Sequence, residues 1–414
     1  MRKETAKRSL EAAVLDAPTA KRILTIGAAA AVLGLGASLG LGLGAGDHLH
    51  RFFYAYLLAF VTVLSVALGA LFFVTLQHLT RAGWSVVVRR VAEALADGVG
   101  ILALLAVPLV AAALMGNHAP FSWAAPTPGD HLLEHKAPFL NATFFAIRLT
   151  IYFLAWMGLS RFFLRSSLAQ DDSKTPEQAV AVTLHSEKVS APAMFVFALT
   201  VTFAAVDLLM SLEPHWFSTI IGVYYFAGCL VAFLAALVLV TLALRRAGKL
   251  PGMTVEHDHD LGKLLYGFNF FWAYIAFSQY MLIWYGDIPE ETVWYQPRQA
   301  GPWLYVALLL LFGHFVVPFV GFMSRRFKRR PASLAFWATW LLVMHVVDML
   351  YVVGPSARPH GASTSPLHFG GIEIAALVGM VGAYVAFLAW RMRGKRLVPI
   401  EDPRLGESLA LQNY

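Results

Sequence analysis

The chain is poor in cysteine and in charged residues. It has one cysteine, Cys229, among 414 residues. An internal disulfide, a cysteine-ligated zinc ion, an iron–sulfur cluster and a CxxCH haem attachment each need two or more thiols, so all four are excluded. Only 14% of the residues are charged and 58% are hydrophobic, whereas a soluble globular domain carries about a quarter charged residues. The composition therefore indicates a membrane protein.

Long apolar runs recur along the whole sequence. A helix rises about 1.5 Å per residue, so roughly 20 apolar residues cross the roughly 30 Å of hydrocarbon in a bilayer. The runs predict an all-α integral membrane protein with ten transmembrane helices. The predicted spans are 23–44, 54–76, 98–115, 140–164, 191–213, 218–244, 264–285, 301–322, 332–353 and 367–391.

Positive charge is concentrated in every second connecting segment. If the N-terminus is inside, the cytoplasmic segments and their boundaries contain 26 of the 32 Lys and Arg residues. Because cytoplasmic loops are rich in Lys and Arg, this bias predicts that both termini are cytoplasmic. The net charge of +7 lies in these short blocks, which argues against a nucleic-acid partner. We expect a cytoplasmic arm at 1–22, a membrane domain at 23–391 and a cytoplasmic tail at 392–414.

The first predicted span follows a basic arm, MRKETAKRSLEAAVLDAPTAKR, and is long for a cleaved signal peptide. We therefore interpret it as an uncleaved signal-anchor. Glycines four residues apart form a strip of small residues on this helix, which predicts close packing against a neighbouring helix. The strip consists of Gly36, Gly40 and Gly44.

Two pairs of spans, four spans apart, resemble each other. The fifth span ends with Asp207 seven residues before Pro214, and the ninth ends with Asp348 seven residues before Pro355. The preceding spans end in the similar segments GLSRFF and GFMSRRF. Since both copies have the same orientation, the repeat predicts two parallel four-helix bundles with the first and last spans outside them. The bundles would comprise about 54–213 and 218–353.

Titratable side chains gather in the outer half of the predicted membrane domain. An ionised carboxylate in hydrocarbon is costly unless it is paired, hydrated or neutralised, so such residues are functional candidates. Carboxylates and imidazoles along helices can pass protons through intervening waters. The alternative is a salt-bridge network in which Arg148 neutralises one acid. The candidates for a proton path are Asp207, Glu213, His215, His345, Asp348, Glu373 and Arg148.

His345 and Asp348 are spaced i, i+3 and are expected to share a helix face. The acid could then orient the imidazole or exchange a proton with it. A haem b between His345 and His314 is a competing interpretation. The two histidines differ in predicted depth by roughly 7 Å, and the sequence has no second pair for an electron path across the membrane, so we favour a chain without haem.

The seventh span is rich in aromatic and amide side chains. Flat apolar walls with a few polar groups are typical of small-molecule pockets, so Trp272, Gln279 and Tyr280 are candidates for a quinone slot. The alternative is an interior helix with an interfacial belt of Trp and Tyr.

The segment EHDHD, Glu256 to Asp260, combines carboxylates and imidazoles, which are metal ligands. It is short and without fixed geometry, so we expect a solvated loop and no metal site. The histidines of the predicted outer loop, such as His118 and His131, lack ligand spacing and are better interpreted as a surface for a partner protein.

Three segments carry a resemblance to a known family. They are SEKVSAPAMFVFALTVTFAAVDLLMSLEPHWFSTIIGVYYFAG, FNFFWAYIAFSQYMLIWYGDIPEET and HFVVPFVGFMSRRFK. The chain resembles the NrfD-like (polysulfide-reductase) membrane subunits of bacterial alternative complex III, a quinol:cytochrome c oxidoreductase, and in particular the second and shorter of its two such subunits. The resemblance covers the predicted fourth to tenth spans.

The resemblance implies a cofactor-free respiratory subunit in the bacterial inner membrane that supports proton translocation and possesses a potential quinone site. The matching proton-path positions are Asp207, Glu213, His215, His345 and Asp348. The implied partners are a larger NrfD-like paralogue, an iron–sulfur subunit, multihaem cytochrome c subunits and small membrane subunits. In the family, the haems c and the iron–sulfur clusters belong to these partners.

Two other classes of function remain open. Ten helices and buried charge also fit a secondary transporter, although transporters commonly use inverted repeats and broken helices. A structural anchor for peripheral redox subunits would use the acids only in packing salt bridges.

Overall fold

The computed structural model of this protein describes residues 10–126, 128–358 and 366–413. Regular secondary structure in these ranges is helical, with one isolated β-bridge between Val14 and Arg396. Nine segments of this described chain are long and apolar enough to cross a membrane. The prediction of an all-α, multi-pass membrane protein is thereby confirmed. The segments are α2 (Ala17–Gly44), α3 (His50–Leu79), Val86–Leu114, α8 (Ala142–Gln170), Pro176–Leu212, α10 (Ile221–Arg246), Pro302–Gly321, Pro331–Ser356 and α17 (Gly371–Met392).

Several of these segments consist of shorter helices joined end to end. Their parts are α4 (Val86–Asp97), α5 (Val99–Leu105) and α6 (Val107–Leu114); α9 (Pro176–Leu208) and the 3-10 turn η2 (Met210–Leu212); α13 (Pro302–Leu309), the π-helix η4 (Leu310–Val316) and α14 (Val317–Gly321); and α16 (Pro331–Val353) with η5 (Gly354–Ser356). Short helices in the connections are η1 (Ser122–Ala124), α7 (His131–Lys136), α12 (Pro289–Thr292), η3 (Pro297–Gln299), α15 (Arg325–Lys328) and α18 (Leu405–Leu409).

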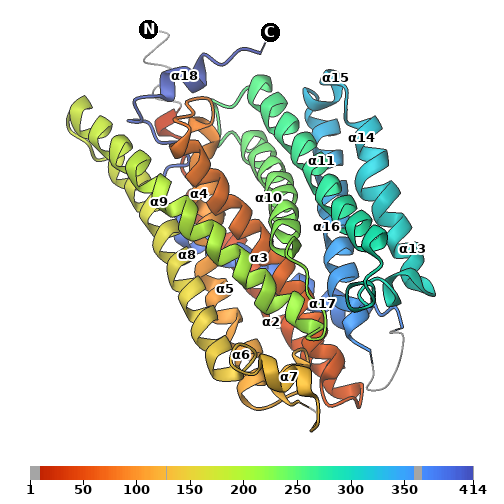
Figure 1. The fold of residues 1–414 in the computed structure, drawn as a ribbon. Helices are drawn as coiled ribbons and strands as arrows, with labels where there is room; N and C mark the ends of the chain where they lie inside the picture. The colour runs from red at the N-terminus through yellow and green to blue at the C-terminus, as the bar shows by residue number, and fades with distance from the viewer. Residues whose placement is uncertain (1–9, 127, 359–365, 414) are drawn as a thin grey trace.

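The predicted seventh span corresponds to α11 (Val255–Gly286), which is not among the nine segments. Its apolar run is interrupted by polar and aromatic side chains, among them Asn269, Gln279 and Tyr280. At 32 residues it is nevertheless about 48 Å long, which exceeds the thickness of a bilayer core. It packs along α10 and contacts α16 (Figure 1).

The expectation of a solvated loop at Glu256 to Asp260 is wrong, because these residues form the first turns of α11. His257 and Asp258 are fully buried. Asp258 forms an ion pair of 2.8 Å with Arg245, and Glu256 pairs with Arg329 at 2.5 Å. The hydrogen bonds from Arg329 lower the pKa of Glu256 to about 2. Local ion pairs therefore explain why this polar segment can form the first turns of α11.

The fifth predicted span also begins earlier than expected. The span was expected to begin at residue 191 after a connecting segment, but α9 starts at Pro176 and continues through Pro192. The Thr175 hydroxyl caps the helix by accepting from the backbone of Gln178. Gln170 of α8 donates to the Ala179 carbonyl at 3.0 Å, so the polar first turns of α9 are held against the neighbouring helix.

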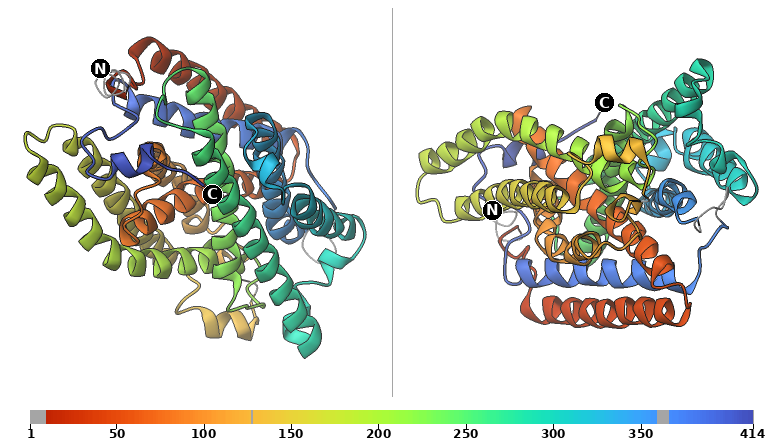
Figure 2. Two further views of the ribbon diagram at one scale, coloured as in Figure 1. Left: turned by 90° about the horizontal axis from the view of Figure 1, so that it is seen from above. Right: turned by 60° about the horizontal axis from the view of Figure 1, so that its bottom comes forward.

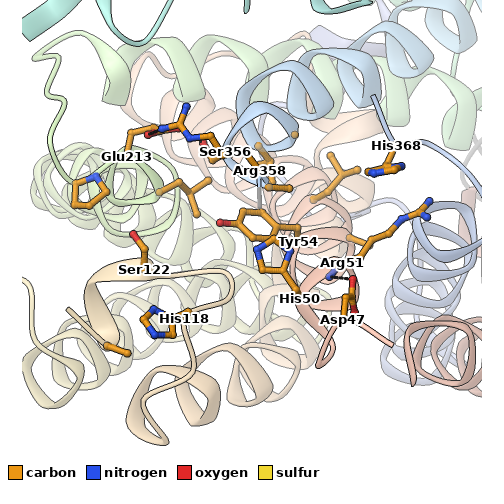
Figure 3. A pocket seen from close by; sticks show the side chains of 18 of the residues that line it. Asp47, His50, Arg51, Tyr54, His118, Ser122, Glu213, Ser356, Arg358 and His368 are labelled. Atoms are coloured by element: carbon orange, nitrogen blue, oxygen red, sulfur yellow. Dashed lines mark hydrogen bonds and ion pairs between the residues drawn. The ribbon is translucent and has the colours of Figure 1, made fainter. Parts of the chain in front are cut away.

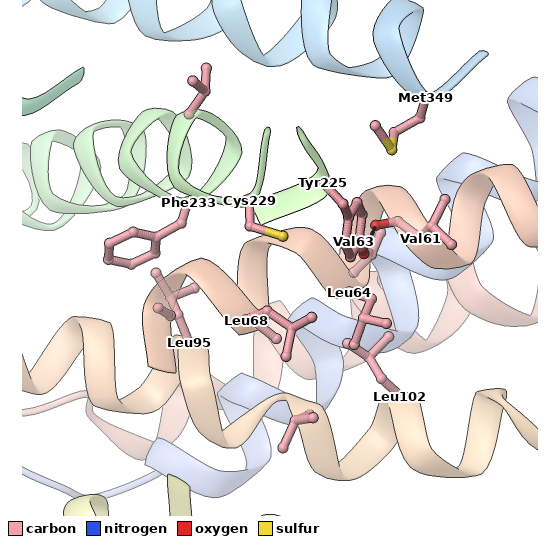
Figure 4. Close-up of a cluster of buried hydrophobic side chains, with 14 of the residues drawn as sticks. Val61, Val63, Leu64, Leu68, Leu95, Leu102, Tyr225, Cys229, Phe233 and Met349 are labelled. Atoms are coloured by element: carbon pink, nitrogen blue, oxygen red, sulfur yellow. Dashed lines mark hydrogen bonds between the residues drawn. The ribbon is translucent and has the colours of Figure 1, made fainter. Parts of the chain in front are cut away.

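The helices form two packed groups that meet at α3 and α10. One group contains α3, α4 to α6, α8 and α9, and the other contains α10, α11, α13, α14 and α16. Between the groups, Gly69 of α3 allows close approach, since a Cβ there would lie 2.2 Å from the Cys229 carbonyl oxygen. Cys229 is fully buried beside Leu68 and Phe233 (Figure 4), so its role is in packing.

A pair of helices, α2 and α17, lies side by side outside both groups and against α3 (Figure 2). Their contact uses Gly34 and Gly379, because a Cβ on Gly34 would lie 2.5 Å from the Gly379 nitrogen. Gly27 and Gly382 make a second close approach. Close packing of the first helix is therefore present, but the predicted strip is wrong, since its members face open space. That strip was Gly36, Gly40 and Gly44.

The N- and C-terminal ends of the described chain lie at the same end of the helix assembly, together with α15 and α18 (Figure 1). The antiparallel bridge between Val14 and Arg396 joins them. Its backbone hydrogen bonds include Leu15 N–H to the Lys395 carbonyl at 3.1 Å. This bridge ties the N-terminal arm to the segment that follows α17.

Candidate functional site

A cavity of about 1160 Å³ (Figure 3) lies at the end of the molecule that carries α7, opposite the chain termini in Figure 1. Its walls come from the turn between α2 and α3, the loop before α7 and the segments that follow α9 and α16. Its inner surface includes Tyr54 and Leu58 of α3 and Leu350 of α16. The histidines in the lining are His48, His50, His118, His215 and His368.

Three of the predicted proton-path residues, Glu213, His215 and Glu373, line this cavity. Glu213 and His215 lie after η2, beyond the last helical turns of the fifth predicted span. Each of the three is engaged with a side chain of opposite or potentially opposite charge, so the lining is a set of ion pairs. The pairs are Arg51–Glu373 at 2.9 Å, Arg358–Glu213 at 2.6 Å and His215–Asp130 at 2.8 Å.

The cavity rim is held by contacts between the loop before α7 and the segment after α9. The backbone N–H of Leu133 lowers the pKa of the Asp130 carboxyl, and the hydrogen bond from His215 lowers it further. Lys136 Nζ donates to the Pro214 carbonyl at 2.6 Å, and burial lowers the pKa of this amine. The rim therefore has a carboxylate in contact with an imidazole, and an amine bonded to the backbone of the same segment.

Asp207 and Arg148 form a separate buried ion pair. Arg148 Nη2 lies 2.6 Å from Asp207 Oδ1, and its Nε lies 3.0 Å from Oδ2. Tyr152 donates its hydroxyl to Oδ2 at 2.9 Å. The guanidinium also donates to the Phe139 carbonyl at 2.8 Å and lies over the Phe139 ring. The carboxylate is thus fully satisfied by an arginine and a tyrosine.

Asp348 lies in a different environment although it is also fully buried. Its hydrogen-bond partners among the described residues are the hydroxyl of Tyr224, on Oδ1, and Trp272 Nε1, which donates to Oδ2 at 3.0 Å. Both partners are neutral. Asp348 therefore has two donors but no counter-charge, whereas Asp207 has both.

His345 lies one helical turn before Asp348 and bonds to Ser65 of α3, with 2.8 Å between Nε2 and Oγ. The single hydroxyl proton of Ser65 is donated to the Thr62 carbonyl at 2.6 Å, so His345 Nε2 is the donor to Ser65. His345 Nδ1 is then an acceptor, and it has no partner among the described residues. His345 and Asp348 share a helix face as predicted, but they do not hydrogen-bond to each other.

The backbone of Gly228 on α10 lies against both groups. A Cβ on Gly228 would lie 3.1 Å from His345 Cε1, 3.4 Å from His345 Nδ1 and 3.7 Å from Asp348 Oδ2. Glycine at this position therefore lets α10 approach the imidazole and the carboxyl closely.

His314 adds a second imidazole with free nitrogens. It is fully buried in the π-helix η4, and within the part of the chain that the structure describes neither ring nitrogen has a partner. Its ring centroid lies 3.7 Å from that of Trp272, which bonds to Asp348. π-Helical turns inside α-helices are frequent at functional sites. We call the following set the buried cluster: Ser65, Tyr224, Trp272, His314, His345 and Asp348.

The buried cluster lies deeper than the cavity. Leu58 lines the cavity, and Ser65 is two helical turns further along α3, a distance of about 10 Å. Within the described chain, no group of three or more His, Cys, Asp or Glu side chains is arranged to hold a metal ion. Trp272 and α10 pack directly beside the imidazoles of His314 and His345, and the haem interpretation gains no support from this packing.

The three candidate quinone residues occupy separate environments. Trp272 belongs to the buried cluster, and Gln279 is buried with Nε2 donating to Ser218 at 3.3 Å. Tyr280 is 37% exposed and packs edge-on against Tyr295. None of the three lines the cavity. They do not converge on one slot, so no quinone chemistry is derived from them.

Sequence reasoning missed Ser65, Tyr152 and Tyr224 as partners of the buried acids and imidazoles. Hydroxyl side chains are frequent in apolar helices, and nothing in the local sequence distinguishes these three. His314 was considered only as a haem ligand. A histidine in the middle of an apolar span already indicates a functional residue, so the sequence could have included it among the proton-path candidates.

The chain matches no model of a known protein family and none of the curated proteins.

Proposed function

We propose that this chain is a cofactor-free membrane subunit of a bacterial respiratory quinol:cytochrome c oxidoreductase of the alternative complex III type, and that it supports proton translocation in the inner membrane. The resemblance of three segments to NrfD-like subunits motivates the choice of complex. In this proposal the chain binds a larger NrfD-like paralogue, an iron–sulfur subunit, multihaem cytochrome c subunits and small membrane subunits. The partners carry the redox centres.

The proposal includes a topology with ten crossings. α11 is the additional crossing, because it is long enough and because an even number of crossings agrees with chain ends at one side of the molecule. The positive charge of the connecting segments supports a cytoplasmic location for that side. The two helix groups are then proposed to be parallel duplicates with Asp207 and Asp348 at equivalent depth.

The observation that carries the proton-transfer role is the contrast between these two acids. Asp207 has a bidentate arginine, whereas Asp348 has two neutral donors and no cation. Beside Asp348 stand two imidazoles with three nitrogens that lack partners. A carboxyl and two imidazoles within one buried cluster are groups that can take up and release protons through a bridging water. We therefore assign proton transfer to the buried cluster, with Asp348, His345 and His314 as its titratable members.

The cavity completes the path in this proposal. Asp130, Glu213 and Glu373, which line it, are each paired, so they serve as a hydrated outer surface that exchanges protons with the buried cluster. Ser65 lies about 10 Å beyond the cavity-lining Leu58 along α3, whereas Asp348 is only two residues from Leu350 of α16, which also lines the cavity.

A structural anchor is the second candidate function. It is favoured by the ion pairs of Asp207, Glu213 and Glu373, each of which joins different helices or loops. An anchor needs no free imidazole nitrogens, so the buried cluster distinguishes the two functions. A secondary transporter is the third class, and copurification of haem c and iron–sulfur proteins with this chain would exclude it.

The test compares Asp348→Asn and Gly228→Ala in the purified complex reconstituted into vesicles. Asp348→Asn keeps the shape and hydrogen-bonding reach of the side chain but removes its titratable group. Gly228→Ala adds one methyl group beside His345 Nδ1 and Asp348 Oδ2 without changing any titratable group. We expect normal subunit yield and a fall in proton-coupled quinol oxidation on the order of 100-fold for Asp348→Asn.

Gly222→Ala is the matched control for Gly228→Ala. It also adds a methyl group to α10 at a crowded position, next to Thr202, but away from the buried cluster. Quinol oxidation and proton release that remain normal in both Asp348→Asn and Gly228→Ala would refute the proton-transfer role and leave the anchor.

A further inference from the structure

The outward-facing side of α8 carries two arginines in an otherwise apolar stripe. Ile147, Ile151 and Leu154 are 49%, 54% and 60% exposed and follow one another at helical spacing. Arg161 and Arg165 continue the same spacing and are also exposed. In a membrane-spanning helix this stripe faces lipid, so both guanidinium groups project from the lipid-facing surface.

Neither of these arginines is satisfied by the protein. In the described part of the chain, no hydrogen bond or ion pair involves the guanidinium group of Arg161 or Arg165. Two arginines of the neighbouring helices α4 and α17 are paired with acids. Arg90 binds Asp171 at 2.7 Å, and Arg391 binds Asp97 at 2.6 Å. Asp171 and Asp97 are thus already neutralised, and Arg161 and Arg165 add two positive charges to an apolar surface.

Arg161 lies close to three helices. A Cβ on Gly100 of α5 would lie 3.7 Å from Arg161 Nη2 and 3.1 Å from the Phe387 ring of α17. The absence of a side chain at Gly100 lets the guanidinium approach α5 beside Phe387. Trp390, 58% exposed, packs against Phe387 with 5.7 Å between ring centroids. Tryptophan at such a position is typical of the membrane–water interface.

The depth of Arg161 along α8 agrees with a position at the membrane–water interface. It is 13 residues from Arg148 along α8, which is about 20 Å, and Arg148 lies at the opposite end beside Asp207. A long arginine side chain can extend from there to the headgroup region at the end of the molecule that carries the chain termini.

We propose that Arg161 and Arg165 bind the phosphate of an anionic phospholipid in that leaflet. The phosphate of the headgroup would pair with the two guanidinium groups and offset one of their two charges, and the acyl chains would lie on the apolar surface of Leu154 on α8 and of Leu104 on α5, which is 64% exposed. Basic sites between transmembrane helices recognise anionic lipid headgroups through this combination of charge and apolar surface. Inorganic phosphate would pair with the guanidinium groups but would leave the apolar surface uncovered.

The test measures lipid binding to the full-length chain purified in mild detergent, by native mass spectrometry. Dioleoylphosphatidylglycerol and dioleoylphosphatidylcholine are the probes, since they share acyl chains and differ in headgroup charge. We expect at least one molecule of the anionic lipid to bind in preference to the zwitterionic one. Arg161→Gln should weaken that binding about 5-fold and Arg161→Gln/Arg165→Gln about 25-fold. Arg161→Lys should retain most of it.

Arg246→Gln is the matched control, because Arg246 is also exposed and unpaired but lies at the end of α10. It should bind the anionic lipid like the wild type. Competition by millimolar inorganic phosphate would identify a free-anion site and overturn the lipid assignment. Equal binding of the two lipids by the wild-type chain, which needs no variant to fold, would overturn the proposal as well, as would unchanged binding by the double variant.

Discussion

Asp207 illustrates at the residue scale how a buried acid is held by its surroundings. Arg148 approaches it with two nitrogens, Tyr152 donates to it, and the remaining guanidinium nitrogen is satisfied by the Phe139 carbonyl. Such a pair is costly to break, because the partner that remains is a charge in a low-dielectric interior. The same reasoning does not apply to Asp348, whose partners Tyr224 and Trp272 are neutral.

We therefore predict that Asp207→Asn destabilises the chain by about 3–5 kcal/mol, since it leaves Arg148 buried without a counter-charge. Thermal unfolding in detergent measures the change. Combining it with Arg148→Met should recover most of the loss, because both charges are then removed. Asp172→Asn, at an exposed acid in the connection between α8 and α9, should have no measurable effect. A fully stable Asp207→Asn variant would contradict the structural role of the pair.

The sequence alone identified the buried acids but not their surroundings. Asp207, Asp348 and His345 stand out because charge and imidazole are rare in apolar runs, and Arg148 was recognised as a possible counter-ion at a similar depth. The partners of Asp348 and His345 could not be found this way. Tyr224 is 124 residues from Asp348 and Ser65 is 280 residues from His345, so the contacts depend on how distant helices pack.

At the scale of elements, hydropathy located the parts of helices that face hydrocarbon and missed their polar extensions. α9 and α11 both begin well before their apolar runs, because capping and ion pairs hold their polar first turns. The sequence also could not predict which glycines of α2 contact a neighbouring helix. Both Gly34 and Gly36 belong to a glycine-rich helix, and only the position of α17 decides which of them contacts it.

The two glycines provide a matched pair of variants. Gly34→Ala should destabilise the chain by about 1–3 kcal/mol, because its Cβ would lie 2.5 Å from the Gly379 nitrogen and the two helices would have to separate. Gly36→Ala should be neutral or slightly stabilising, since that position is open and alanine favours helix. Thermal unfolding of both variants under one condition gives the comparison. Equal stability of the two would show that the α2–α17 contact is not as close as described.

At the scale of the whole molecule, the number of crossings and the position of the chain ends constrain each other. Nine segments of the described chain pass the criteria of length and hydropathy, and nine crossings would put the ends on opposite sides. The ends instead lie together, joined by the bridge between Val14 and Arg396. Either α11 is a tenth crossing, or one of the nine segments does not cross.

Cysteine labelling at the two ends of α11 decides between these cases. The only native thiol, Cys229, is fully buried, so the wild-type chain should not react with a membrane-impermeant maleimide. Ala247→Cys, just after α10, and Glu290→Cys, in α12, both place a thiol at an exposed position. If α11 crosses the membrane, Glu290→Cys is labelled on intact cells, and Ala247→Cys, which follows two arginines, is labelled only after permeabilisation. Labelling of both thiols from the same side would remove α11 from the crossings, and the reverse pattern would place the chain termini outside.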